Sequence, residues 1–330
     1  NDENGSIAGQ LAITVLKTQS VYSTSFLKKY VETISKIGNR GFWVNGPVIH
    51  SNNKKNRMQI LETFMNALDE IANKFNLMII DGYSTPQDQL IDEEFLKTFR
   101  KNGYKIEDFM TFVFDLSKSL EDIWMNVKRY TRTNVKRAPK RDITINEIKS
   151  KEELKKFYDL AAKWGKTKGL KNNVSYSSIT DDWKKIKDET DKFFLAYQDK
   201  ELISAIRLSY FNGIASPTQV LSSYAKVASL GGPALTWHAI KWAKESGLRI
   251  YDLTGGQDSP KNKEAKKDYE KQWQSLLTYK RKWGGEEIPY YHFVKIKKKL
   301  SYKLFRALSK PDLIYRTYKK EKLVKAHKEK

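Results

Sequence analysis

The chain has 330 residues, of which 39% are hydrophobic and 12% aromatic, a composition typical of a globular protein long enough for two domains. It contains no cysteine, and its four histidines lie far apart in sequence, which argues against disulfides, thiol nucleophiles and metal sites. The net charge of +22 predicts polyanionic partners such as nucleic acid, nucleotide phosphates or anionic lipid headgroups.

The first half of the chain alternates strand and helix patterns. Apolar residues recur at i, i+4 and i+7 over 57–75 and predict a helix. A longer helix is predicted over 117–137, because basic residues gather in its last turns and Pro139 follows its end. The other predicted elements are strands over 6–15, 41–44, 77–80 and 110–116 and a helix over 93–101.

Capping and turn residues mark the elements of the second half. Ser150 and Glu153 form a capping-box pair that begins a helix. Pro233 predicts the first turn of another helix, which Gly247 ends. The predicted strands are 143–148, 193–197 and 202–208 as a hairpin around Asp199 and Lys200, 219–225, and 248–253.

We place the predicted domains at 1–149 and 150–294, followed by a basic helical tail at 295–330. The tail carries fourteen Lys or Arg residues against three acids, so its net charge of +11 is half that of the whole chain. If the tail is helical, Leu300, Leu304 and Leu308 share one face. This pattern predicts either a helix at an anionic membrane surface or a helix packed on the second domain.

A second basic cluster ends the predicted helix 117–137. The cluster consists of Lys128, Arg129, Arg132, Lys136, Arg137, Lys140 and Arg141.

No apolar run approaches the length of about 18 residues that a transmembrane helix needs, and the first residues do not resemble a signal peptide. We therefore expect a cytoplasmic protein, with peripheral contact at the inner face of the membrane as a further option.

The stretch 250–291 is the most informative part of the sequence. A strand ends in Asp252 and opens into Gly255 and Gly256, and a cation-aromatic-glycine cluster follows at 279–285. This order resembles the C-terminal half of the FemABX family of aminoacyl-tRNA-dependent peptidyltransferases. In the first half, the resemblance continues in Gly46-Pro47-Val48, in 111–117 and in 130–140.

The resemblance implies an α/β (α+β) fold of two tandem GNAT-like (acyl-CoA N-acyltransferase-like) domains with mixed sheets flanked by helices. The span 164–193 is too short for a helical arm, so a compact, FemX-like form is expected. The implied reaction is formation of an amide bond between an amino acid from aminoacyl-tRNA and an amine of a peptidoglycan-type envelope precursor. The implied partners are aminoacyl-tRNA and a lipid- or nucleotide-linked precursor, with no further cofactor.

Lys280 and Asp252 are the candidate catalytic residues. Lys280 aligns with the lysine of the family's aromatic-Lys-x-x-aromatic-Gly segment, and it either stabilises the oxyanion of the tetrahedral intermediate or binds tRNA phosphate. Asp252, at the carboxyl end of a strand, either orients the amine and accepts its proton or caps the glycine-rich turn. Tyr279 and Trp283 are expected in the core, and Gly284 in a tight turn.

Several further residues are candidates for substrate binding. Arg207 and Tyr224 lie on neighbouring predicted strands and could line the acceptor site. Arg281 and Lys282 are expected to contact phosphate or solvent. Many family members carry Arg or Lys directly before the Gly-Pro step, where Asn45 stands here, so Arg40 or Lys54 is a candidate for the phosphate contact in its place.

Two other functions remain open at this point. Acyl-CoA-dependent relatives cradle pyrophosphate in a glycine-rich loop before a helix. The matching segment, 229–234, keeps two glycines, but Pro233 removes one N–H. The first alternative is therefore an N-acyltransferase that uses acyl-CoA on an amino sugar or small amine. The second is a non-catalytic nucleic-acid-binding or membrane-binding protein of the same fold.

Overall fold

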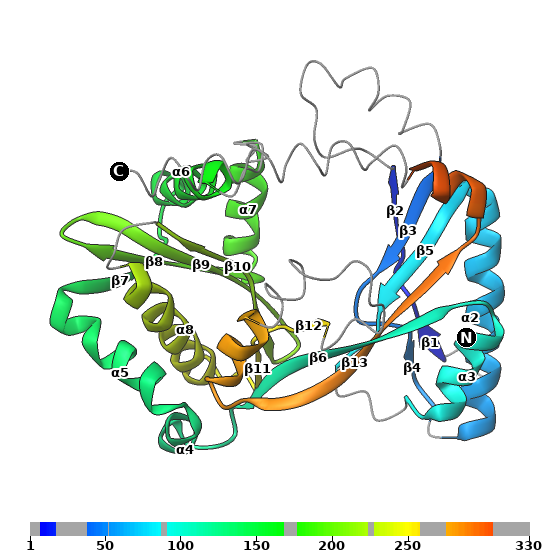
Figure 1. Ribbon diagram of the computed structural model, residues 1–330, viewed down its shortest axis with the longest axis horizontal. Helices are drawn as coiled ribbons and strands as arrows, with labels where there is room; N and C mark the ends of the chain where they lie inside the picture. The colour runs from blue at the N-terminus through cyan, green and yellow to red at the C-terminus, as the bar shows by residue number, and fades with distance from the viewer. Residues whose placement is uncertain are drawn as a thin grey trace. The chain divides into compact units, whose positions relative to one another are not determined.

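The computed structural model describes residues 7–17, 38–51, 53–86, 91–167, 177–223, 228–257 and 275–305 (Figure 1). The chain forms two compact units. Unit 1 contains the chain up to Met110 and the segment that starts at Ile288, and unit 2 contains most of the rest. These limits differ from the predicted division at 149/150, because residues between Phe112 and Ile143 pack into the core of unit 2.

In the described residues, unit 1 contains a mixed sheet and the helices α2 and α3 packed around one hydrophobic core. Its strands are hydrogen-bonded in the order β2-β3-β5-β13-β6, with β3 parallel to β5 and the pairs β2/β3 and β5/β13 antiparallel. The strands β1 and β4 pair separately. The elements are β1 (Gly9–Gln10), β2 (Thr14–Lys17), β3 (Asn39–Trp43), β4 (Val48–Ile49), α2 (Lys54–Lys74), β5 (Leu77–Tyr83), α3 (Glu93–Lys101), β6 (Lys105–Asp115) and β13 (Glu286–Ile296).

The helices α2 and α3 begin at side-chain caps. Asn53 accepts a hydrogen bond from the backbone N–H of Asn56 at 3.1 Å, so α2 starts three residues before the predicted position. Asp92 caps α3 in the same way, and the predicted bounds 93–101 are confirmed. The predicted strand 6–15 is wrong in extent, because this segment forms the two short strands β1 and β2.

Unit 2 is a sheet covered by helices on both faces. Its strand order is β6-β11-β10-β9-β8-β7, in which only the pair β10/β11 is parallel among the pairs whose register is defined in the described residues. Figure 1 shows α6 and α7 on one face and α8 with α5 on the other. The elements are α4 (Leu120–Asn126), α5 (Arg129–Arg137), η2 (Pro139–Arg141), β7 (Ile143–Glu147), α6 (Lys151–Thr167), α7 (Ser178–Lys187), β8 (Asp191–Gln198), β9 (Glu201–Phe211), β10 (Ile214–Ser222), α8 (Ala228–Glu245), β11 (Ile250–Asp252) and β12 (Gly256–Gln257).

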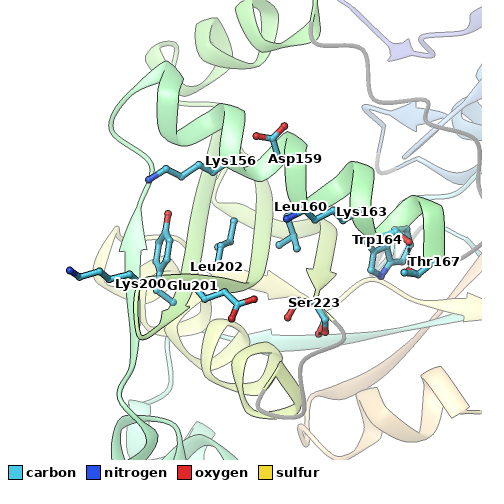
Figure 2. Close-up of a pocket in the computed structure, with 12 residues that line it drawn as sticks. Lys156, Asp159, Leu160, Lys163, Trp164, Thr167, Lys200, Glu201, Leu202 and Ser223 are labelled. Carbon is cyan, nitrogen blue, oxygen red and sulfur yellow. Dashed lines mark hydrogen bonds between the residues drawn. The ribbon is translucent and has the colours of Figure 1, made fainter. Parts of the chain in front are cut away.

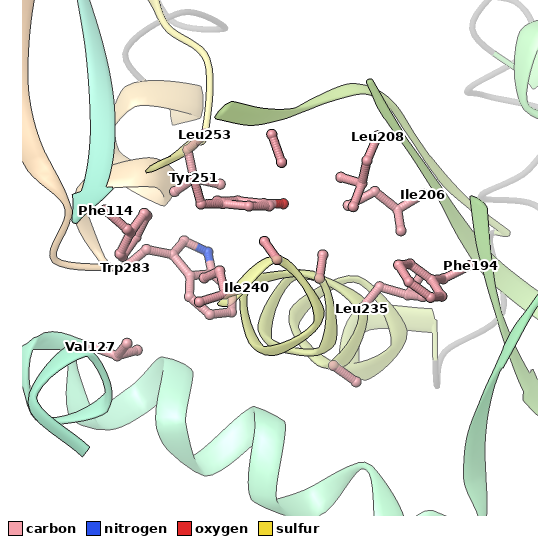
Figure 3. Close-up of a cluster of buried hydrophobic side chains, with 14 of the residues drawn as sticks. Phe114, Val127, Phe194, Ile206, Leu208, Leu235, Ile240, Tyr251, Leu253 and Trp283 are labelled. Atoms are coloured by element: carbon pink, nitrogen blue, oxygen red, sulfur yellow. The ribbon is translucent and has the colours of Figure 1, made fainter. Parts of the chain in front are cut away.

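The double covering follows from the alternation of side chains along the strands. In β8, Phe193 and Leu195 enter the core below α6, whereas Phe194 and Ala196 enter the core that contains α8. Figure 3 shows the second of these cores, with Tyr251 and Trp283 packed beside α8. The predicted fold class, α/β with mixed sheets flanked by helices, is confirmed.

The predicted helix 117–137 is wrong in two respects, because it begins only at Leu120 and is broken into α4 and α5. The break falls at Val127, whose side chain is buried, and at Lys128, whose ψ of 142° leaves the helical region. The N–H of Lys128 donates to the carbonyl oxygen of Lys282 at 2.9 Å. A contact with a distant segment therefore replaces a hydrogen bond within the helix.

Helix α8 also differs from the prediction. It begins at Ala228, so Pro233 is its sixth residue and not part of its first turn. The segment 229–234, which matched a pyrophosphate loop in sequence, consequently lies inside the helix. The predicted end is confirmed, because Gly247 follows α8 with a φ of +74°.

Other local predictions are confirmed. Ser150 accepts a hydrogen bond from the N–H of Glu153 at 3.2 Å, as a capping residue does. Asp199 and Lys200 have φ values of +47° and +67° between β8 and β9, the signs of a type I′ hairpin turn.

Only the first part of the basic tail is described, and it contains a helical segment at 299–305 in which Leu300 and Leu304 are exposed. The rest of the tail, with Leu308, lies outside the described residues. Within the ranges that the structure describes, every helix is too short or too polar to cross a membrane.

Candidate functional site

The site in unit 2 begins at the carboxyl end of β11. This strand lies between β10 and β6, and Asp252 is its last residue, as predicted. One carboxylate oxygen of Asp252, Oδ1, accepts hydrogen bonds from the N–H of Thr254 at 2.7 Å and from the hydroxyl of Thr111. The other oxygen, Oδ2, has no hydrogen-bond donor among the described residues. Asp252 therefore caps the turn, as one interpretation of the sequence proposed, and keeps an oxygen for a further partner.

Lys280 reaches the same turn from the helical segment 275–281. Its side chain is only 7% exposed, and its ammonium donates to the carbonyl oxygen of Thr254 at 2.8 Å and to the hydroxyl of Thr254 at 3.0 Å. An ammonium group has three N–H donors. Two are held by Thr254, and the third has no acceptor among the residues that the structure describes.

Burial changes the acidity of both candidate catalytic groups. It lowers the pKa of Lys280 to about 8, although the nearby negative charge of Asp252 opposes this effect. Burial raises the pKa of Asp252, whereas the Thr111 hydroxyl, the Thr254 N–H and Lys280 lower it. The two predicted residues are thus brought together as an interacting pair. Perturbed pairs of this kind are concentrated at functional sites.

Thr254 joins the pair, and the sequence analysis missed it. Its φ of +60° lies in the left-handed region, which β-branched residues rarely adopt. This backbone conformation lets the N–H contact Asp252 while the carbonyl oxygen contacts Lys280. Strained residues often occur where a site must be held in one arrangement. The only sequence cue is the position of Thr254 between Asp252 and the glycine pair.

The residues after Lys280 fix the segment in the core. Trp283 is fully buried, as predicted, and packs with Tyr251 and Phe114 (Figure 3). Tyr279 is only partly in the core: 37% of the residue is exposed, although its ring packs against Trp283 and burial raises the pKa of its hydroxyl. Gly284 has a φ of +75°, and a Cβ atom at this position would collide with the carbonyl oxygen of Asn126. The predicted tight turn therefore requires glycine.

Two of the other predicted binding residues, Arg207 and Arg281, pair with acids of unit 2. Arg207 binds Asp182 and Asp191 with its guanidinium group at 2.5–2.9 Å, which ties α7 to β8 and β9. Arg281 pairs with Glu287 at 2.9 Å, and Lys282 is exposed. Tyr224 lies outside the described residues. Substrate binding by these residues stays a prediction.

A second polar cluster lies in unit 1 and contains the predicted Arg40. The guanidinium of Arg40 pairs with Asp81, a nearly fully buried residue in β5. His292 contacts Asp81 at 3.0 Å and Glu107 at 3.2 Å through its two ring nitrogens, and its ring stacks on Tyr83. These contacts lower the pKa of Asp81 although burial opposes them. Asp81 directly follows the predicted strand 77–80, and no sequence pattern gave it a functional role.

Unit 2 also contains a cavity of about 420 Å³ between α6 and the β8–β9 hairpin (Figure 2). Neither Lys280 nor Asp252 lines it, so it is distinct from the site described above. Its lining combines cations, acids and aromatic rings, which include Lys156, Lys163, Trp164, Tyr197, Lys200 and Glu201.

Comparison by sequence identifies no relative, since no protein-family model matches and no curated protein is significantly similar. Comparison of structures identifies proteins with a similar fold. The crystal structure of FemX matches with a TM-score of 0.63 and 17% identity, over 92% of this chain and 88% of that chain. The chain has the fold of FemX.

Two further structures match this chain less closely. L-PGS from Bacillus licheniformis matches with a TM-score of 0.51 and 13% identity over 82% of each chain. A conserved protein of unknown function from Bacteroides thetaiotaomicron VPI-5482 also reaches 0.51, with 9% identity over 77% of this chain and 79% of that one. The resemblance of the sequence motifs to the FemABX family is thus confirmed at the level of the fold.

Proposed function

We propose that this protein is an aminoacyltransferase that forms an amide bond between an amino acid carried by tRNA and an amine of a cell-envelope precursor. The FemX fold, the motif order over 250–285 and the net charge of +22 support this proposal. The observation that carries it is the buried ammonium of Lys280, which has one N–H left beside a carboxylate.

The proposed chemistry needs positioning and charge stabilisation more than covalent help, because the aminoacyl ester is already activated. The neutral acceptor amine attacks the ester carbonyl, and the free N–H of Lys280 donates to the oxyanion that forms. Oδ2 of Asp252 accepts the proton that the nitrogen loses. The C–N bond is completed as the ester C–O bond breaks, and the ribose oxygen takes the proton from Asp252 and leaves as a hydroxyl group.

The pKa of Lys280 suits this role at neutral pH. With a pKa of about 8, about nine-tenths of the molecules carry the ammonium at pH 7. A cation is thus present at the start of the reaction, and it is more acidic than an exposed lysine, which strengthens its hydrogen bond to a developing oxyanion.

The test is transfer of radiolabel from mixed aminoacyl-tRNA to extracts that contain lipid-linked or nucleotide-linked envelope precursors. Wild type should transfer label, and the transfer rate of Lys280→Met should be at least about 100-fold lower, as expected when one oxyanion donor is removed. Lys244→Met is a matched control, because the Lys244 ammonium also donates to a backbone carbonyl oxygen, that of Leu116 at 2.7 Å. Its transfer should stay near that of wild type.

Two results would contradict the proposal. Equal transfer by wild type and Lys280→Met would remove Lys280 from the reaction. No transfer from aminoacyl-tRNA, combined with acetyl transfer from acetyl-CoA to an amino sugar, would assign the protein to the acyl-CoA-dependent alternative.

A further inference from the structure

Helix α5 and the turn η2 carry seven cations that we call the basic stripe: Lys128, Arg129, Arg132, Lys136, Arg137, Lys140 and Arg141. All but Arg132 are exposed. Among the described residues, no carboxylate forms a salt bridge with any of them. Uncompensated positive charge of this density attracts a polyanion.

The shape of α5 favours nucleic acid over a membrane surface. Only Thr131 of this helix is buried, and the helix presents no continuous apolar face. An interfacial membrane helix needs such a face to enter the headgroup region. Arg129, Arg132 and Lys136 recur at i, i+3 and i+7, so they lie along one side of the helix, as contacts to a phosphodiester backbone require.

The basic stripe is continuous with the Lys280 segment. The N–H of Lys128 donates to the carbonyl oxygen of Lys282 at 2.9 Å, and the Lys282 ammonium lies 5.9 Å from the centre of the Tyr130 ring. Tyr130 is 69% exposed. An exposed aromatic ring therefore lies where the stripe meets the segment that carries the catalytic candidate.

We propose that the basic stripe binds the phosphodiester backbone of the donor tRNA, and that Tyr130 stacks on a base of its single-stranded 3′ end. This inference rests on the proposed function, because the aminoacyl ester is at that 3′ end. Base–aromatic stacking tolerates any base and combines with phosphate contacts in single-strand recognition. The stripe thus leads the ester towards Lys280.

The test measures binding of uncharged tRNA by fluorescence anisotropy across a salt series. The variant R129Q/K136Q/R137Q/K140Q removes four cations of the stripe. Each lost phosphate contact lowers the salt slope by about 0.7–0.9, so the slope should fall by about 3, and the affinity at 0.1 M salt should fall at least about 10-fold. The matched control, K149Q/K151Q/K184Q/K187Q, removes the same charge from exposed positions elsewhere in unit 2 and should keep the wild-type slope.

Substitution of Tyr130 tests the stacking step separately. Tyr130→Leu should weaken binding of a single-stranded oligonucleotide with the tRNA 3′ sequence at least about 5-fold, whereas Tyr130→Phe should not. The inference is overturned if the stripe variant and its control lose equal affinity for tRNA. It is also overturned if the stripe variant loses binding to phosphatidylglycerol vesicles but not to tRNA. Stripe-dependent tRNA binding without aminoacyl transfer would sustain the docking surface while the proposed reaction fails.

Discussion

Replacing Lys280 by Met removes a buried ammonium and keeps the length of the side chain. Burial lowers the pKa of Lys280 from 10.5 to about 8, so the folded protein holds this proton less tightly than the unfolded chain. At about 1.4 kcal/mol per pH unit, the charge costs about 3 kcal/mol of folding free energy below pH 8. The cost declines between the folded and unfolded pKa values. As the pH rises from 6.5 to 9.5, the free energy of unfolding of wild type should therefore increase by about 2 kcal/mol relative to that of Lys280→Met.

The assay is urea denaturation of both proteins at the two pH values. The hydrogen bonds to Thr254 that Met cannot make are missing at both, so their loss largely cancels in the comparison. Leu277→Met, a buried substitution in the same segment that removes no charge, should show a difference from wild type that does not change with pH. A Lys280→Met difference that is equally constant, or that changes with the opposite sign, would refute the assignment of a buried, destabilising charge.

Three other substitutions test neighbouring parts of the structure. Asp252→Asn removes the negative charge that raises the Lys280 pKa, so an NMR titration of labelled lysine should show a lower pKa for Lys280; an unchanged value would contradict the coupling. Tyr251→Phe removes a fully buried hydroxyl that lacks a hydrogen-bond partner among the described residues, and it should raise the free energy of unfolding in urea by about 1 kcal/mol, whereas a loss would indicate a bound water. Gly284→Ala forces a side chain into the left-handed region and against the Asn126 carbonyl, so the melting temperature should fall by an amount that corresponds to about 2–4 kcal/mol. A melting temperature equal to that of wild type would show that the turn can relax.

The sequence predicted two residues of the site, Asp252 and Lys280, but not the contact that connects them. Asp252 and Lys280 follow from the motif order, since one ends a strand and the other belongs to a cation-aromatic-glycine cluster. Their meeting point, Thr254, could not be predicted, because a positive φ at a β-branched residue is set by surrounding contacts and not by its own preference. Asp81 and His292 were missed for a related reason. They are 211 residues apart, so no local spacing connects them.

The errors in secondary structure have the same origin. The pattern over 117–137 is helical throughout, yet α4 and α5 separate where the backbone of Lys282 accepts a hydrogen bond from Lys128. Helix α8 extends upstream of Pro233, although proline is most favourable in a first turn, because its inner side packs in the core. Local propensity yields to tertiary contacts in both cases.

The position of β13 has a consequence for synthesis on the ribosome. In unit 1 this strand lies between β5 and β6, and its residues pair with a strand made about two hundred residues earlier. Until Glu286–Ile296 emerges, β5 lacks its partner on that side, and Phe293 is missing from the core around Phe99. The N-terminal unit must therefore wait until Glu286–Ile296 has been synthesised. In the interval its open strand edges are exposed to other nascent chains, which is the situation that chaperones relieve.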